Sequence, residues 1–112
     1  MAENLSQQKC EPCEGGVDPL TRDDFEPYLE QVTDWSVVEN DKKIERNFEF
    51  KNFPQALEFV NEVGEIAEDE GHHPDIFIHG WNNVKISLWT HAIGGLSIND
   101  FIVATKIDKV NV

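Results

Sequence analysis

All four histidines of the chain lie within residues 71–96, about a quarter of its length. They are His72, His73, His79 and His91. Imidazole has the side-chain pKa closest to neutral pH. Several imidazoles near one another suit general acid–base catalysis, because one can be neutral while another is protonated. His79 lies within a predicted strand, and we expect it to be structural.

The other three histidines flank predicted loops. His72 and His73 follow the end of a predicted helix, and Pro74 biases His73 toward an extended backbone. Adjacent residues in an extended segment point in different directions, so the two rings are not expected to do the same job. His91 ends a predicted strand, and Gly94 and Gly95 just after it permit a tight loop. These two loops can meet at one edge of a small domain, which predicts a single pocket.

Two other interpretations stay open on the pattern alone. The three histidines can be unrelated residues near the ends of elements. They can also be metal ligands, since three imidazoles are a familiar zinc set. Adjacent histidines rarely ligate one ion, however, and no helical His-x-x-x-His spacing is present, so the metal site ranks below acid–base chemistry.

The elements that must position these residues can be read from periodicity and capping signals. They are a helix from residue 21, strands 35–40 and 43–50, a helix over 52–71, strands 75–80 and 82–91, and a helix over 97–110. This order predicts an α+β, two-layer fold: a four-stranded antiparallel sheet with helices packed on one face (α-ββ-α-ββ-α). The other face is expected to meet solvent or another subunit, and Trp89, predicted there, favours a subunit.

Two apolar patterns predict the core. Alternation in the last strand places Val84, Ile86 and Leu88 on one face. Helical spacing predicts a stripe on the helix 52–71. Its members are Phe53, Ala56, Leu57, Val60, Val63 and Ala67.

Composition limits the class of protein. The chain has 112 residues, enough for one domain, and its net charge is −13. That charge disfavours binding of nucleic acid or of an anionic membrane surface. Residues 1–20 lack periodicity and predict a mobile leader before a domain at 21–112, without a signal peptide. We therefore expect a cytoplasmic protein. The leader contains Cys10 and Cys13, which we interpret as a reduced, non-catalytic pair.

The motifs around the histidines resemble the pterin-4a-carbinolamine dehydratase (4a-hydroxytetrahydrobiopterin dehydratase) family. An acidic residue precedes "HHP" by four positions, an aromatic residue followed by Asn comes next, and "THAIGGLSIND" closes the series. The resemblance covers about residues 21–110. Its matching positions are Glu68, His72, His73, Pro74, Trp81, Asn82, Val84 and Thr90 to Asp100.

The resemblance implies dehydration of a 4a-hydroxytetrahydropterin to the quinonoid dihydropterin, without cofactor or metal. It implies a homodimer or homotetramer that acts on a reduced pterin, with an aromatic amino acid hydroxylase pathway as a possible source of substrate. His72, His73 and His91 would be the catalytic set, with His72 and His91 as acids toward the leaving hydroxyl. His73 would hold or deprotonate the pterin.

The resemblance also implies supporting residues: Glu68, Pro74, Trp81, Thr90 and Asp100. Trp81 stands where Tyr is common in the family, at the expected pocket edge. Gly71 stands where some relatives have a polar residue, so Glu68 is the expected carboxylate partner of His72. The alternative is a non-catalytic dimerisation or coactivator-type module of the same fold, because members of the family can also act in that way.

Overall fold

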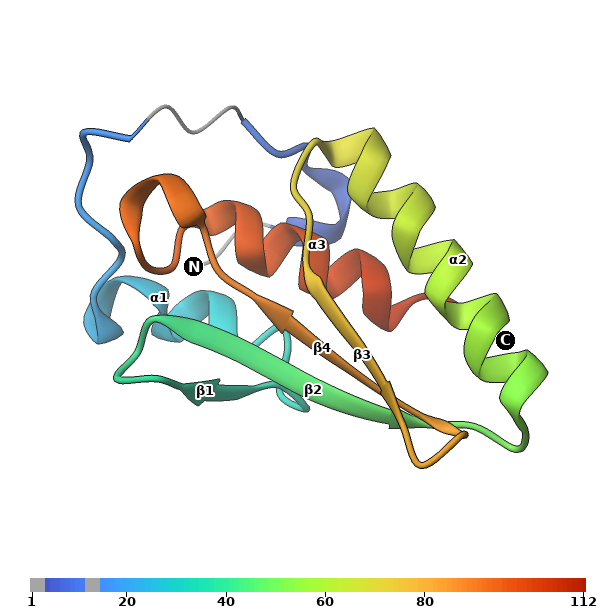
Figure 1. Cartoon of the computed structure of the whole chain (residues 1–112). Coiled ribbons are helices and arrows are strands. Elements are labelled where there is room, and N and C mark those ends of the chain that lie inside the picture. The colour runs from blue at the N-terminus through green and yellow to red at the C-terminus, as the bar shows by residue number, and fades with distance from the viewer. Residues whose placement is uncertain (1–3, 12–14) are drawn as a thin grey trace.

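The computed structural model describes residues 4–11 and 15–112. Four strands form one antiparallel sheet in the order β1-β2-β4-β3, and three α-helices cover one of its faces (Figure 1). The elements are η1 (Leu5–Gln7), α1 (Arg22–Leu29), β1 (Ser36–Val38), β2 (Lys43–Glu49), α2 (Phe53–Glu70), β3 (Asp75–His79), β4 (Asn83–Leu88), η2 (His91–Ile93) and α3 (Ile98–Asp108). The predicted α+β architecture and its element order are confirmed, and two short 3₁₀ turns are added.

Local signals set the boundaries of the helices. Thr21 and Asp24 form a capping box at the start of α1, and Ser97 and Asp100 form one at the start of α3. Gly71 ends α2 in the left-handed conformation, with φ of 65°, which glycine adopts without a steric penalty. These three boundaries agree with the sequence.

The core lies between the sheet and the helices. Ile44 on β2 pairs with Leu88 on β4, and both side chains are fully buried. Val84 and Ile86 are buried on the same face of β4, as the alternation predicted. β4 is a central strand, whereas β3 lies at an edge of the sheet, so β4 carries most of the apolar contact.

The apolar stripe of α2 differs in part from the prediction. Its buried residues are Ala56, Phe59, Val63 and Ala67. Phe53 and Leu57 are 45% and 40% exposed, so they lie on the flank of the helix. Helical spacing allows either flank to face the sheet, and packing against α3 and β4 decides which one does.

Part of the predicted leader belongs to the folded domain. Leu5 is fully buried in the core cluster, and its backbone amide donates to Gln31 Oε1 at 3.1 Å. Figure 1 shows this N-terminal segment against α3 and the C-terminal end of α2. The absence of periodicity over residues 1–20 therefore did not mean an absence of packing. The mobility of the leader stays a prediction, and Cys13 lies outside the described residues.

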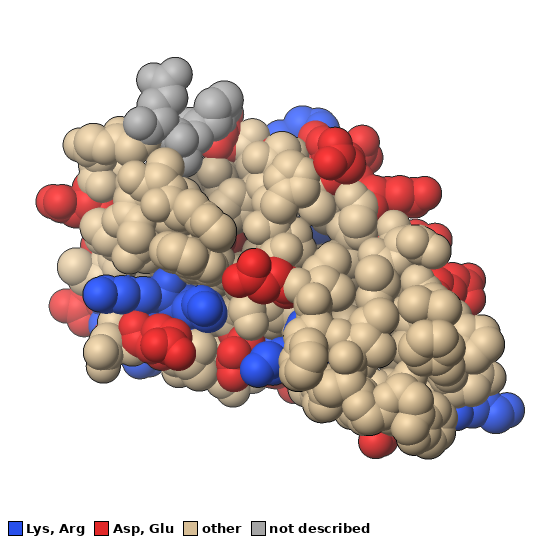
Figure 2. Space-filling view, in the orientation of Figure 1, with Lys and Arg blue, Asp and Glu red and all other residues tan. Residues whose placement is uncertain are grey.

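The β3–β4 hairpin exposes large aromatic side chains and carries few charged ones. Phe77 is 55% exposed and Trp81 at the turn is 62% exposed. Figure 2 shows that charged side chains are scarce over this hairpin, whereas acidic side chains follow the outer edge of α2. Within the described residues, no helix is both long and apolar enough to cross a bilayer.

Candidate active site

The three predicted histidines meet at one pocket. Its volume is about 290 Å³, at the low end for sites that bind small molecules. The described residues that line it are Glu11, Gly71, His72, His73, Trp89, Thr90, His91, Ala92 and Asn99. The pocket therefore collects the end of α2, the end of β4, the turn η2, the start of α3 and one residue of the N-terminal segment.

Two tight turns bring the histidines together. After Gly71 the chain reverses, and the amide of His72 donates back to the carbonyl of Ala67 at 3.2 Å. On the other side, the amide of Thr90 donates to the carbonyl of Gly95 at 2.8 Å, which closes the loop that carries His91. A loop after a helix and a loop after a strand thus meet at one edge of the domain, as the sequence predicted.

A buried carboxylate holds His72. Asp100 is fully buried, and its Oδ1 lies 2.6 Å from Nε2 of His72. Its Oδ2 accepts from the Thr90 hydroxyl at 2.8 Å and from the Ser97 amide at 2.9 Å. An ionised carboxylate can only accept hydrogen bonds, so the tautomer of His72 that fits Asp100 has its proton on Nε2 and leaves Nδ1 to exchange a proton with a ligand.

This geometry corrects the expected partner of His72. Glu68 contacts His73 instead, with 3.0 Å between Oε1 and Nε2. Both side chains are largely exposed, Glu68 by 80% and His73 by 62%. Asp100 has two jobs: it completes the capping box of α3 and it orients His72. The sequence suggested the first job, and the contact across 28 positions appears only in the folded chain.

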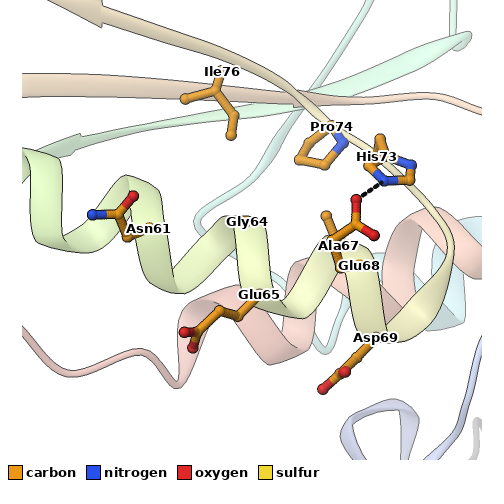
Figure 3. Close-up of a pocket in the computed structure, with 9 residues that line it drawn as sticks. All are labelled: Asn61, Gly64, Glu65, Ala67, Glu68, Asp69, His73, Pro74 and Ile76. Atoms are coloured by element: carbon orange, nitrogen blue, oxygen red, sulfur yellow. Dashed lines mark hydrogen bonds and ion pairs between the residues drawn. The ribbon is translucent and has the colours of Figure 1, made fainter.

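His73 also borders a second hollow. Figure 3 shows this groove of about 880 Å³ between α2 and β3, with His73 and Glu68 joined at one end and Ile76 on the opposite wall. Pro74 lines the groove and not the histidine pocket. The groove is the larger hollow, but it contains a single histidine. The smaller pocket is therefore the better candidate for acid–base chemistry.

An aromatic stack supports His91. The rings of Trp89 and His91 lie 4.0 Å apart at 25° to each other. Nε1 of Trp89 is buried and has no hydrogen-bond partner among the described residues. Trp89 was expected on the open face of the sheet, opposite a partner subunit, whereas the structure places it in the wall of the pocket. It follows β4, which ends at Leu88, so strand alternation no longer sets its direction.

Trp81 does not line the pocket. It occupies the β3–β4 turn with φ of 62°, at the other end of the hairpin from Thr90. The five residue steps of β4 alone span about 17 Å. The expected place of Trp81 at the pocket edge is therefore wrong within this chain. His79 lies on the same distant part of the hairpin and contacts Asn47 at 2.6 Å, in line with a structural role.

Two residues for which the sequence predicted no role of their own complete the pocket wall. Asn99 is 5% exposed, and its side chain binds both backbone groups of Glu11. Glu11 lies outside the family resemblance, and Asn99 lies within the "THAIGGLSIND" motif without an expected role. Spacing carries no signal for a contact across 88 positions, so only the tertiary structure could reveal this one.

The neighbouring ion pair also ties the N-terminal segment to the helices. Lys106 lies 2.6 Å from Oε2 of Glu70, and the amide of Cys10 donates to Oε1 of Glu70 at 2.8 Å. Burial alone would raise the pKa of Glu70, but these donors and the nearby charges of Lys106 and Lys9 hold that pKa below its usual range. Burial and the charge of Glu70 raise the pKa of the Cys10 thiol to about 12, so this thiol stays neutral.

No group of three or more His, Cys, Asp or Glu side chains in the described part of the chain is arranged to hold a metal ion. One ring nitrogen of His72 contacts Asp100, and one ring nitrogen of His73 contacts Glu68.

A family model described as pterin 4 alpha carbinolamine dehydratase matches residues 18–110. The chain belongs to this family. The match includes every predicted site residue and leaves out the segment that contains Glu11. The resemblance recognised around the histidines is thereby confirmed.

Relatives of this dehydratase-family chain extend over almost its whole length. A protein of Alkaliphilus metalliredigens, named for the dehydratase with the activity marked as unproven, is 49% identical over 107 residues, 95% of each chain. Pterin-4-alpha-carbinolamine dehydratase 2 of Arabidopsis thaliana is 46% identical over 112 residues, which cover 97% of this chain and 60% of the relative.

The fold agrees with a solved relative. A crystal structure of a transcriptional coactivator/pterin dehydratase from Brucella melitensis matches with a TM-score of 0.75 and 31% identity, over 81% of this chain and 96% of that one. A pterin dehydratase-like RuBisCO assembly factor matches with a TM-score of 0.57 and 21% identity, over 66% of this chain and 84% of that one. That second likeness concerns the fold alone.

Proposed function

We propose that the protein is a dehydratase that removes water from a 4a-hydroxytetrahydropterin and releases the quinonoid dihydropterin. The observation that carries this proposal is the pocket at which His72, His73 and His91 meet, with His72 oriented by the buried Asp100. Membership of the dehydratase family supports the same reaction. Because some proteins of this fold are named for other roles, the activity requires its own test.

The reaction needs a proton donor and a proton acceptor at one small site. The C4a–O bond breaks as the hydroxyl takes up a proton and leaves as water, while N5 loses its proton and the C4a–N5 double bond forms. His72, through Nδ1, and His91 serve as acids toward the leaving hydroxyl. His73 holds the pterin or takes the N5 proton. Positioned imidazoles accelerate such steps by about 10²–10⁴-fold.

The remaining predicted residues support this set. Thr90 fixes Oδ2 of Asp100 through its hydroxyl, which keeps Oδ1 free for His72. Glu68 orients His73 from the solvent side. Pro74 keeps His73 extended, so that it faces both the pocket and the groove. The reaction as written uses no metal and no cofactor.

The experiment follows quinonoid product in an assay in which a pterin-dependent hydroxylase generates the 4a-hydroxytetrahydropterin in situ. We expect the wild-type protein to accelerate dehydration. We expect His72→Ala, His73→Ala and His91→Ala each to lower turnover by more than tenfold, a modest share of what general acid–base groups contribute. His79→Ala is the matched control, because His79 lies outside the pocket, and it should retain wild-type turnover.

Other outcomes would assign the protein differently. Wild-type activity that is lost on exhaustive chelation would favour the metalloenzyme interpretation. A folded wild-type protein without activity would leave the dimerisation or coactivator-type module. The proposed homodimer or homotetramer has apolar side chains available on β3, where Ile76 and Phe77 are exposed, and light scattering measures its size. The cytoplasmic location stays a prediction.

A further inference from the structure

One wall of the histidine pocket comes from a part of the chain that the family model does not cover. That model begins at residue 18, whereas Glu11 lines the pocket together with the three histidines. The segment that contains Glu11 is fixed by specific hydrogen bonds. Its place at the site is therefore a feature of this fold and not of a loose terminus.

Asn99 clamps the backbone of Glu11. Nδ2 of Asn99 donates to the Glu11 carbonyl at 2.6 Å, and the Glu11 amide donates to Oδ1 of Asn99 at 3.0 Å. These two hydrogen bonds satisfy the Glu11 backbone in the way that a neighbouring β-strand would. The next residue along α3 is Asp100, which holds His72. One turn of α3 thus positions both the N-terminal wall and the catalytic imidazole.

A second anchor and the returning chain keep the segment at the pocket. The amide of Cys10 is bound by Glu70, which is paired with Lys106. At Gly15 the described chain again adjoins the pocket, because a Cβ atom built there would lie 3.1 Å from the carbonyl oxygen of Ala92. The described residues before and after 12–14 therefore both approach residues that line the pocket.

Glu11 is the carboxylate available to a ligand in this pocket. It is the one acidic residue among the described lining residues. Asp100 lies behind the pocket, and its oxygens are taken by His72, Thr90 and Ser97. Both backbone groups of Glu11 are bound to Asn99, so the side chain is the part that remains to meet a substrate.

The chemistry of a pterin matches a carboxylate. The pyrimidinone edge of a pterin presents N3–H and the 2-amino N–H side by side, and both are donors. A carboxylate offers two acceptor oxygens and can bind such a pair of donors bidentately, with charge assistance. A pteridine with a 2-oxo group in place of the 2-amino group presents an acceptor beside N3–H, which a carboxylate repels.

We propose that the Glu11 carboxylate binds the 2-amino and N3–H edge of the pterin, and so selects 2-aminopteridines over 2-oxopteridines. Asn99 is the positioning residue that holds Glu11 at the pocket. This inference deepens the proposed dehydratase function and rests on its substrate class. It assigns pterin recognition to the N-terminal segment and leaves proton transfer to the histidines.

The test compares binding of 6-methylpterin and 6-methyllumazine by calorimetry, since the two differ in the 2-amino and 2-oxo groups. We expect the wild-type protein to bind 6-methylpterin about 10–100-fold more tightly, as a charge-assisted hydrogen-bonded pair contributes. In Glu11→Gln, the amide accepts from N3–H and donates to the 2-oxo group. The preference should therefore invert toward 6-methyllumazine.

Two further variants separate this role from stability. Asn99→Ala should bring the affinity ratio close to one without inverting it, because the segment is released. Glu58→Gln, an exposed residue on α2, should leave the ratio at the wild-type value. A merely structural role of Glu11 would weaken both ligands equally. An unchanged ratio in Glu11→Gln would overturn the inference.

The same protein samples distinguish the two proposals in the dehydration assay. If Glu11→Gln inverts the ligand preference while the wild-type protein fails to dehydrate the carbinolamine, the inference stands and the proposed reaction fails. If the wild-type protein is active and Glu11→Gln retains both its KM and its ligand ratio, the reaction stands and the inference fails.

Discussion

Replacing Asp100 by Asn tests whether the buried carboxylate sets the protonation pattern of His72. The substitution keeps the shape of the side chain and exchanges one oxygen for an amino group. The carboxylate accepts from three donors at 2.6–2.9 Å. If the Asn oxygen keeps the Ser97 amide, its amino group faces Nε2 of His72. His72 must then accept there, which moves its proton to Nδ1.

The magnitude follows from burial. Asp100 is fully buried, so an N–H of the introduced amino group that finds no acceptor cannot turn to water. Such a loss costs about 1–3 kcal/mol of folding free energy. The catalytic effect should be larger, because a neutral imidazole with its proton fixed on Nδ1 no longer cycles between acid and base at the substrate. We expect turnover to fall by about 100-fold or more.

Asp108→Asn is the matched control. Asp108 lies on the same helix and accepts from Nε1 of Trp35 and from Arg46, both at 2.8 Å. Burial raises the pKa of this carboxyl despite those two donors. The control should lose the charge that faces Arg46, and with it some stability, without any contact to the pocket. The assay measures turnover and thermal unfolding of both variants at a temperature at which both are folded.

The reasoning predicts a split between the two variants. Asp100→Asn should lose turnover far beyond its loss of stability, and Asp108→Asn should lose stability alone. Equal turnover in the wild-type protein and Asp100→Asn would refute the role given to the buried carboxylate. A parallel fall in both variants would assign the effect to stability.

Three other results are expected. In a Cys13→Ser variant, alkylation of Cys10 by iodoacetamide at pH 8 should be about 1,000-fold slower than alkylation of a free thiol. The reason is that the Cys10 pKa of about 12 leaves little thiolate. A rate near that of a free thiol would mean that the N-terminal segment does not dock. The lowered pKa of Glu70 contributes stability above the ordinary carboxyl pKa of about 4.3 that is lost as pH falls through the folded value. The thermal unfolding temperature should therefore fall less steeply between pH 6 and pH 3 in Glu70→Gln than in the wild-type protein. Identical slopes of unfolding temperature against pH would contradict this account. Glu68→Gln should change stability by less than about 1 kcal/mol, since its pair with His73 is exposed, and a larger change in chemical denaturation would contradict the exposure of the pair.

Local sequence signals determined the elements and their order. Caps at Thr21, Asn52 and Ser97 and the stop at Gly71 act over a few residues, and helix ends depend on such near neighbours. Period-two alternation placed Val84, Ile86 and Leu88 in the core, because a strand buried on one face must alternate. The loops that carry the histidines were likewise predictable from the residues that flank them.

The tertiary structure alone decided which distant groups meet. Spacing could not choose the flank of α2 that faces the sheet, so Phe53 and Leu57 were assigned to the core although both are exposed. The partner of His72 is Asp100 and not the nearer Glu68, since the reversal at Gly71 turns the ring toward α3. A contact of this kind depends on how the layers pack and leaves no periodic trace in the sequence.

The N-terminal segment shows the same division most clearly. Its sequence lacks hydrophobic periodicity, which favoured a leader outside the domain. In the structure, however, Leu5 is fully buried and Glu11 lines the pocket. Single side chains such as Gln31 and Asn99 anchor it through its backbone. Backbone amides and carbonyls are the same in every residue type, so the sequence reveals that they need partners but not which partners the fold supplies.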